Sequence, residues 1–241
     1  MGISYAVFTD KGGREVNEDS VGVARNAANH CFVLCDGLGG HGMGDAASSL
    51  VVDVFKDQFS KTDDVVNFLE QAFCASQDIL MAEQIARNAK RKMKTTAVAV
   101  VTDDRNAYIG HIGDSRAYVF SKGRVKTRTQ DHSIPQMLVL SGEIKEKEIR
   151  NHPERSIILR VMGVDWEEPM YELMSPLPLK KCQAFLLCSD GFWELIEEKD
   201  MCESLKRAKT VDEWMQSMTK TVKENGKDRN MDNYSAIAVW I

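Results

Sequence analysis

The most constraining feature of the sequence is a glycine-rich loop between an apolar run and a helical pattern, all within residues 30–50. The run HCFVLC stops at Asp36, and glycine occupies five of the next eight positions. Because glycine has no Cβ, backbone amides and carbonyls in such a loop can approach a ligand closely. A strand that ends at a carboxylate and continues into this loop indicates a binding site. A simple hairpin turn is the alternative, since Asp-Gly is among the strongest turn signals.

The rest of the chain predicts an α+β protein with antiparallel sheets. Short alternating or β-branched segments predict strands at 3–9, 20–24, 95–102, 106–113, 116–123, 124–129 and 234–241. Apolar residues at helical spacing predict helices from Ala47 to Phe55, at about 63–88, at 197–208 and at 211–225. The segment 183–195 repeats the opening pattern, with an apolar strand that stops at Asp190 and a helix after Gly191. Blocks of strands alternate with pairs of helices, which favours α+β over strict strand–helix repeats.

Composition excludes several classes of protein. With 241 residues, 43% of them hydrophobic, the chain is long enough for one sizeable core. No apolar run approaches the ~18 residues that cross a bilayer, and no signal peptide is recognisable, so we expect a cytoplasmic protein without membrane contact. A net charge of −5 disfavours nucleic acid as a partner, and KRKMK at 90–94 is interpreted as a solvated connector. The six cysteines form no CxxC pair, so neither a zinc site nor a disulfide framework is indicated.

Acidic residues recur where the predicted strands begin or end. They are Glu18, Asp19, Asp36, Asp114, Asp190 and Asp232. In an antiparallel sheet the end of one strand and the start of its neighbour share an edge, so these carboxylates can converge. Converging carboxylates repel one another unless cations lie among them, and oxygen ligands select Mg²⁺ or Mn²⁺. Two such ions suit attack on phosphorus, and Arg14 offers a planar donor for a phosphate. Independent acidic turns are the alternative.

Six motifs in order extend this interpretation to nearly the whole chain. They are REVNED at 14–19, DGLGGHGMGDAAS at 36–48, GDSRAY at 113–118, DHS at 131–133, SDGFWE at 189–194 and DNYSAIAV at 232–239. With them the chain resembles the protein phosphatase 2C family of metal-dependent serine/threonine phosphatases, in particular its compact bacterial members. The resemblance implies a four-layer α-β-β-α sandwich, with two antiparallel sheets flanked by helix pairs. It also implies one catalytic domain over residues 1–241, with an irregular flap at about 133–170 that governs substrate choice.

The resemblance also implies a role for each site residue. Asp36 would bridge two metals, the Gly37 carbonyl would bind one of them, and Asp190 and Asp232 would complete the pair. Glu18 would act through a bound water. Asp114, together with Asp190, corresponds to the third-metal site of bacterial members, and Arg14 would hold the substrate phosphate.

Two positions depart from the family pattern. Glu18 replaces the glutamine of many bacterial members, which adds negative charge at the metals. Leu38 replaces a histidine that is the proposed general acid in some members, which leaves His41 as a candidate for that role.

The implied function is hydrolysis of phosphoserine and phosphothreonine in proteins by a metal-activated water. The cofactors would be two Mn²⁺ or Mg²⁺ ions, and the family allows a third. The partners would be phosphorylated proteins, substrates of a Ser/Thr kinase, and we expect a monomer. Two other functions stay open: a regulator that binds phosphoproteins without turnover, and a metal-dependent nuclease or phosphodiesterase.

Overall fold

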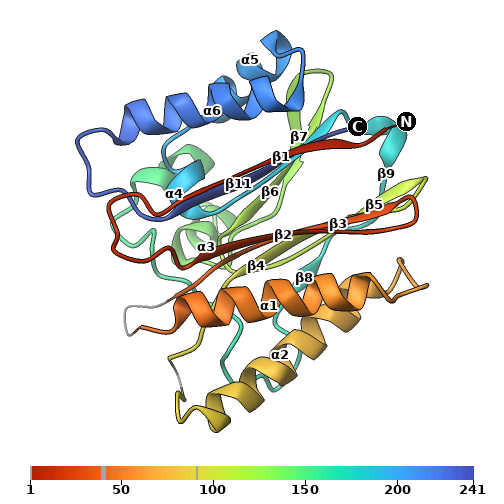
Figure 1. Ribbon diagram of the computed structural model, residues 1–241. Helices are drawn as coiled ribbons and strands as arrows, with labels where there is room; N and C mark the ends of the chain where they lie inside the picture. The colour runs from red at the N-terminus through yellow and green to blue at the C-terminus, as the bar shows by residue number, and fades with distance from the viewer. Residues whose placement is uncertain (1, 39–41, 91) are drawn as a thin grey trace.

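Two antiparallel sheets lie face to face, with helices on both outer faces, in the computed structural model of the chain (Figure 1). The structure describes residues 2–38, 42–90 and 92–241. The layer order is α-β-β-α, which confirms the fold class expected from the resemblance. None of the helices in the described ranges carries an apolar stretch long enough to cross a membrane.

Each sheet is built from neighbouring antiparallel strands. The first sheet contains, in spatial order, β1 (Ser4–Asp10), β11 (Tyr234–Trp240), β10 (Ala184–Cys188), β6 (Arg116–Ser121) and β7 (Arg124–Arg128). The second contains β2 (Asp19–Asn26), β3 (Asn29–Asp36), β4 (Ala97–Thr102), β5 (Asn106–Ile112) and β8 (Glu172–Leu173), and β9 (Leu177–Pro178) also pairs with β5.

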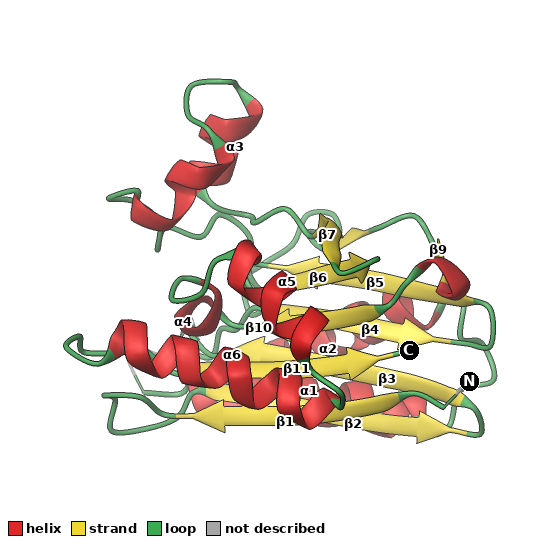
Figure 2. Ribbon diagram, turned by 90° about the horizontal axis from the view of Figure 1, so that it is seen from above, coloured by secondary structure: helices red, strands yellow, loops and turns green. Residues whose placement is uncertain are grey.

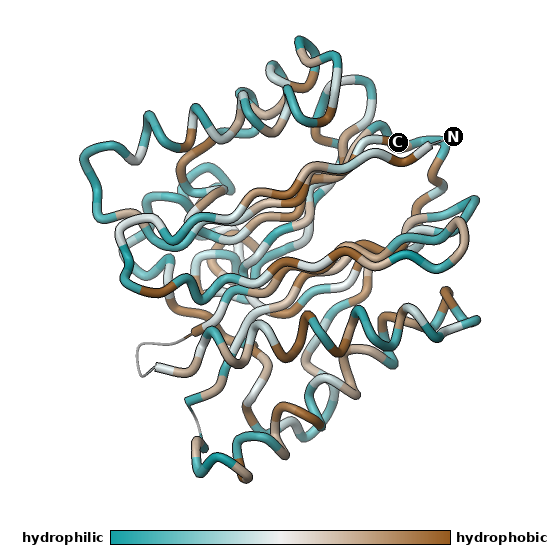
Figure 3. Tube along the Cα trace, in the orientation of Figure 1, coloured by the Kyte–Doolittle hydropathy of each residue, from teal (hydrophilic) through white to brown (hydrophobic). Residues whose placement is uncertain are grey.

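The central strands are buried on both faces, and the two faces carry side chains of different size. In β3, Phe32 and Leu34 point to the core between the sheets, while Cys31, Val33 and Cys35 point to the helices. Successive side chains of a strand alternate between faces, so each strand contributes to two cores. Figure 3 shows the resulting hydrophobic stretches along the strands of both sheets. The buried thiols behave as small hydrophobic groups, as their apolar surroundings in the sequence indicate.

Helix pairs cover the outer faces. The helices α1 (Gly44–Phe59) and α2 (Phe68–Ala86) pack on the second sheet, and α5 (Glu198–Arg207) and α6 (Val211–Gly226) pack on the first. The short helix α4 (Asp190–Trp193) directly follows β10.

The expected start of the second helix at about residue 63 is wrong. The Asp64 carboxylate accepts hydrogen bonds from the backbone and the side-chain amide of Asn67, at 3.1 and 2.8 Å. This local turn satisfies donors that a helix would otherwise use, so the helix begins at Phe68. The predicted strand 116–123 likewise ends at Ser121, because Lys122 and Gly123 adopt positive φ angles in a hairpin turn.

The irregular segment after β7 forms only short elements. These are α3 (Ile134–Leu140) and the 3₁₀ helices η1 (Glu146–Asn151) and η2 (Leu179–Lys181), together with the two-residue strands β8 and β9. Figure 2 shows α3 standing away from the sheets.

Candidate active site

The acidic residues named from the sequence meet at one edge of the sandwich. Cys188, the last residue of β10, pairs with the first residue of β6 and with Ala236 of β11, so Asp190 and Asp232, which flank β10 and β11, lie at the same end of the first sheet. In the second sheet, Asp19 pairs directly with Asp36. A cleft of about 950 Å³ opens between these strand ends. Its walls include Arg14, Glu18, Asp36, Gly37, Leu38, Asp114, Asp190 and Asp232.

Gly44, at the end of the glycine-rich loop, lies against Gly37, which begins the loop after β3. A Cβ on Gly37 would lie 2.3 Å from the carbonyl oxygen of Gly44, and a Cβ on Gly44 would lie 2.9 Å from Glu18 Oε1. Only glycine fits such a close approach of two backbones. The loop therefore brings the backbone of Gly37 against Glu18, whose carbonyl accepts the Gly37 N–H at 3.0 Å.

Burial and, after it, mutual repulsion determine the electrostatics of the carboxylates in the cleft. Burial, followed by the charges of Asp19, Asp190, Asp114 and Asp232, raises the pKa of Asp36 well above its usual range. Burial and the nearby Asp232 raise the pKa of Asp190 to about 7, and Asp190 and Asp36 are close enough to share a hydrogen bond. Carboxylates this close do not all stay ionised at neutral pH unless a positive charge lies among them.

The donor set fits divalent cations. Asp114 Oδ1 and Asp19 Oδ1 are buried and have no hydrogen-bond partner within the described ranges. A buried carboxylate oxygen without a partner is costly unless a cation or proton neutralises it. The potential metal ligands that line the cleft are carboxylate oxygens, with no histidine or cysteine among the described lining residues, and oxygen ligands are what hard ions such as Mg²⁺ and Mn²⁺ prefer.

Asn233 holds the two sheets together beside the carboxylates, a role that sequence reasoning missed. Its Oδ1 accepts the backbone N–H of Glu18 at 2.8 Å, and its Nδ2 donates to the carbonyls of Lys11 and Val16 at 2.9 and 3.0 Å. Ser189 makes a second link, since its hydroxyl donates to Asp19 Oδ2 at 2.8 Å. No sequence pattern marks Asn233 beyond its place before a strand.

Positive side chains also reach the cleft. Arg14 Nη2 donates to Asp232 Oδ2 at 2.9 Å, and both side chains are about half exposed. Lys92 and Lys94, from the segment 90–94 interpreted as a solvated connector, line the cleft as well, and Lys92 is exposed. Leu38 is held in place by its N–H, which donates to the Lys94 carbonyl at 2.9 Å. The candidate general acid His41 lies outside the described residues.

The comparisons with known proteins agree with this geometry. A family model described as Protein phosphatase 2C matches residues 12–234. The chain belongs to the protein phosphatase 2C family. The serine/threonine phosphatase stp of Listeria monocytogenes serotype 4b is 31% identical over 213 residues, which cover 85% of this chain and 84% of that protein. The family inferred from the six motifs is thereby confirmed.

Solved structures extend the similarity to the whole fold. Serine/threonine phosphatase Stp1 from Staphylococcus aureus superimposes with a TM-score of 0.91 at 29% identity, over 100% of this chain and 96% of that one. The catalytic domain of serine/threonine protein phosphatase PstP, in complex with two manganese ions, gives a TM-score of 0.80 at 26% identity, over 99% and 97% of the two chains.

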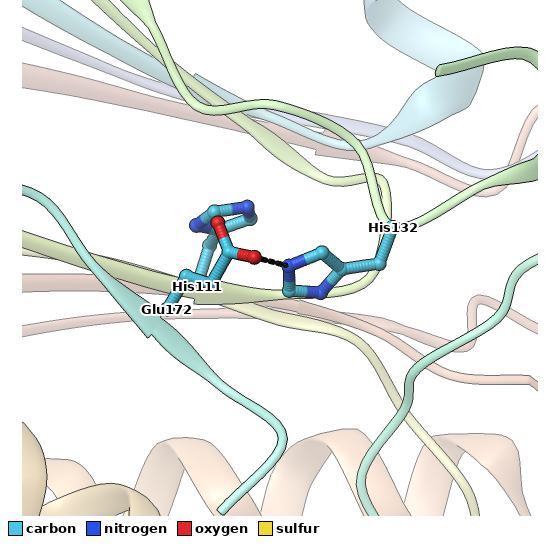
Figure 4. A group of neighbouring side chains, drawn as sticks. All are labelled: His111, His132 and Glu172. Carbon is cyan, nitrogen blue, oxygen red and sulfur yellow. Dashed lines mark ion pairs between the residues drawn. The ribbon is translucent and has the colours of Figure 1, made fainter. Parts of the chain in front are cut away.

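A second group of potential metal ligands in this phosphatase 2C chain lies apart from the acidic cleft. His111 of β5, His132 and Glu172 of β8 place one donor atom each within 4.8 Å of one another (Figure 4). The Gly113 N–H donates to His132 Nδ1 at 3.2 Å, so the proton of this neutral ring is on Nε2, which lies 3.3 Å from a Glu172 oxygen. Burial and the nearby His111 lower the pKa of His132 to about 4.

The protonation of His132 argues against a metal at this second group. A ligating histidine normally donates its other ring N–H to an acceptor, as His111 does to the Gln130 carbonyl at 2.6 Å. His132 instead accepts at Nδ1, so binding a metal at Nε2 would leave both of its nitrogens without a proton. The group therefore fixes the turn at Gly113 to β8.

The pKa shifts in the acidic cleft predict how stability depends on pH. The pKa of Asp190 is raised to about 7 and that of Asp19 to about 6, while both lie near 4 in the unfolded chain. Protonation of these groups stabilises the fold fully below about pH 4, and this contribution is lost as pH rises through 6 and 7. Bound Mn²⁺ removes the repulsion, so we expect the rise in Tm on adding Mn²⁺ to be larger at pH 7 than at pH 5, by about 5 °C.

Thermal denaturation with Mn²⁺ and with chelator, across pH 5 to 8, checks this prediction. The lowered pKa of His132 makes stability depend on pH in the opposite direction. This contribution is the same with Mn²⁺ and with chelator, so it cancels when the two Tm values are subtracted. In an Asp190→Asn variant, the rise in Tm on adding Mn²⁺ should depend less on pH. A metal-induced rise in Tm that is constant with pH would contradict the expectation.

Proposed function

We propose that this chain is a metal-dependent phosphatase that hydrolyses phosphoserine and phosphothreonine in proteins. The single observation that carries the proposal is the meeting of four aspartates from both sheets with Glu18 and Arg14 in one cleft. Relatives named serine/threonine phosphatase support the substrate class. A binding protein without turnover has no need for so costly a concentration of buried carboxylates.

The proposed ligands come from both sheets. Asp36 would bind both ions, the Gly37 carbonyl would bind one of them, and Asp190 and Asp232 would complete the pair. Glu18 would act through a bound water. Asp114, whose Oδ1 is buried without a partner among the described residues, would help to hold a third ion with Asp190. When bound, divalent cations lower the pKa of a coordinated water and neutralise phosphate charge. The manganese ions in the PstP structure support Mn²⁺ or Mg²⁺ as the cofactor.

Arg14 is the proposed phosphate-binding residue. Its guanidinium is exposed at the cleft and is already oriented by Asp232 at 2.9 Å. A guanidinium can donate two parallel hydrogen bonds to phosphate oxygens, which a lysine cannot do. Arg14 would thus fix the phosphorus in line with the attacking water, and this positioning contributes to the rate.

Two further roles are proposed, one for His41 and one for the segment 133–170. His41 is the proposed donor of a proton to the serine or threonine oxygen as it leaves the phosphorus. Ser156, Ile158 and Val161 line the acidic cleft, which supports the segment 133–170 as the flap that selects substrates. Several expectations stay predictions from the sequence. They are a single catalytic domain over residues 1–241, a monomeric state, a place in the cytoplasm and a partner Ser/Thr kinase.

Hydrolysis of a short phosphothreonine peptide tests the proposal. We expect phosphate release in Mn²⁺, none in excess chelator, and a KM about 10- to 100-fold higher for Arg14→Ala, because a bidentate charge-assisted contact is lost. Arg25→Ala, at an exposed arginine far along β2, is the control and should leave KM unchanged. Activity that persists in chelator would overturn the mechanism.

The same assay separates the two alternatives. A regulator without turnover would bind the phosphopeptide but release no phosphate in Mn²⁺. A nuclease or phosphodiesterase would cleave single-stranded DNA, which we expect to remain intact.

A further inference from the structure

A second cleft, of about 900 Å³, lies at the opposite end of the sheets from the acidic cleft. Five lysines line it, from four different elements: Lys122, Lys126, Lys180, Lys181 and Lys206. The other lining residues are Trp240, Gln183, Gly123, Ser121, Cys182, Leu205 and Ala208, so no acidic side chain is among them. We call this surface the lysine cleft.

The positive charge of the lysine cleft is not compensated. All five lysines are exposed, and none forms an ion pair with any of the described residues. Elsewhere, by contrast, Lys56 and Lys220 each lie within 4.0 Å of a carboxylate on the same helix, and Lys61, just after α1, lies 2.6 Å from Asp57. Five unpaired ammonium groups around one concavity, in a chain of net charge −5, form a local field that attracts anions.

The floor of the lysine cleft is rigid. Lys122 and Gly123 form a tight hairpin turn with φ angles of 52° and 69°. The Gly123 N–H donates to Gln183 Oε1 at 2.6 Å, which ties the turn to the start of β10. The stem of Lys206 lies over the same turn, since a Cβ on Gly123 would come within 2.9 Å of Lys206 Cγ. The ammonium groups are therefore presented by a framework that is ordered before any ligand binds.

Three adjacent strands connect the lysine cleft to the acidic cleft. Strand β11 begins just after Asp232 and ends at Trp240, β10 begins just after Lys181 and ends just before Asp190, and β6 runs from the Asp114 turn to Lys122. The seven residues of β11 span about 23 Å at about 3.3 Å per residue. One polypeptide can reach both clefts if enough residues separate the parts that occupy them.

We propose that the lysine cleft binds an acidic segment of a substrate protein whose phosphorylated residue occupies the acidic cleft. This inference rests on the proposed phosphatase function and names a second requirement on the substrate. An extended segment of about 7 residues spans 23 Å in a straight line, so a path around the surface needs about 10 or more. Binding at the lysine cleft would raise the local concentration of the phosphorylated residue and lower KM.

The shape and chemistry of the surface favour a peptide over other polyanions. A membrane is nearly flat, and ammonium groups around a concavity cannot all reach its headgroups. The surface contains no arginine to bind a single phosphate through two bonds, so dispersed charges are a better match. Trp240 and Leu205 offer apolar contact to the aliphatic parts of a peptide. A long nucleic acid would extend beyond the five lysines over a chain whose net charge is −5.

The first test measures binding without catalysis. A fluorescent, unphosphorylated ten-residue Asp/Glu-rich peptide should bind the full chain in Mg²⁺, and binding should weaken with added salt. Lys180→Ala/Lys181→Ala should weaken it at least about 5-fold, while Lys61→Ala/Lys220→Ala, which removes the same charge elsewhere, should change it less than about 2-fold. Absent binding, or equal loss in both variants, would overturn the proposal. So would tighter binding of single-stranded DNA or anionic vesicles through the same lysines.

The second test measures turnover. A phosphothreonine peptide with the acidic stretch attached through 12 residues should have a KM about 5- to 10-fold below that of the peptide without the stretch, at equal kcat. A 3-residue spacer should give no gain, because it cannot span the two clefts. Lys180→Ala/Lys181→Ala should abolish the gain and leave the plain peptide unaffected.

The two hypotheses fail in different ways in these tests. If the plain peptide is not hydrolysed in Mn²⁺, the proposed function fails, whereas the binding test still decides on the lysine cleft. If the plain peptide is hydrolysed but the acidic stretch on the 12-residue spacer does not lower KM, the lysine cleft does not dock substrates.

Discussion

Replacing Asp36 by asparagine is expected to lower kcat by about 10³-fold while raising the Tm of the protein in chelator. The loss follows from removing the carboxylate that would bridge two ions, and with it the positioning of water and phosphate. The gain follows from the burial and the repulsion that raise the pKa of Asp36, because asparagine keeps the shape and removes one of the buried, converging charges. A relief of about 1 kcal/mol corresponds to about 3 °C in a chain of this size.

Paired measurements of phosphate release and thermal denaturation check both expectations for Asp36→Asn. Asp53→Asn is the control, because this exposed carboxylate on α1 pairs only with Lys56 and lies outside the cleft. It should leave kcat unchanged. A fall in the chelator Tm of Asp36→Asn would mean that repulsion among the carboxylates is not what limits stability at this edge.

The second large effect is expected at the buried ion pair of Arg116 and Asp131. The two side chains are 3% and 1% exposed, and the guanidinium donates to both carboxylate oxygens, at 2.8 and 2.6 Å. Burial alone would raise the pKa of Asp131, but the charge of Arg116 holds it below its usual range. Asp131→Asn removes the bidentate counter-charge of the buried Arg116 and leaves it the more distant Glu198, at 4.0 Å, which costs about 3 to 5 kcal/mol and lowers Tm by about 10 °C.

The Arg116–Asp131 pair also supports the acidic cleft. The Arg116 guanidinium stacks on Trp193, 3.4 Å from the ring centroid, and the Trp193 indole N–H donates to the Asp114 carbonyl at 3.0 Å. We therefore expect Asp131→Asn to weaken metal-dependent activity even below its Tm, through displacement of Asp114.

Denaturation curves with a matched control check the stability effect. Asp57→Asn removes an exposed pair with Lys61 and should cost less than about 1 kcal/mol. A double replacement, Arg116→Met/Asp131→Leu, should be less destabilised than Asp131→Asn alone, because no unpaired buried charge is left. If the single variant melts at the wild-type temperature, Arg116 must find another counter-charge.

The parts of the fold that were predictable from the sequence depend on local pattern. Alternating apolar residues mark β4 to β6, and helical spacing marks α1 and α6, since each pattern reflects the periodicity of its own element. The proximity of Asp190 and Asp232 was also predictable, because strand polarity brings both positions to one end of the first sheet, whereas the approach of Asp36 depends on how the second sheet packs against it.

The parts that were not predictable depend on residues distant in the chain. Asn233 joins three backbone groups more than two hundred positions away, and no local signal encodes that contact. Lys94 reaches the acidic cleft only because its carbonyl accepts the Leu38 N–H. The start of α2 was missed because the turn at Asp64 competes with helix through side-chain bonds that helical periodicity does not reveal.

The division of the proposed ligands between the sheets has a mechanical consequence. Glu18 directly precedes β2 and Asp36 ends β3, whereas Asp190 and Asp232 flank β10 and β11 in the opposing layer. Bound ions would therefore act as a removable cross-link that resists sliding of one layer over the other. Any substitution that alters the spacing of the layers, even deep in the hydrophobic interior, would be transmitted to the distance between the ions.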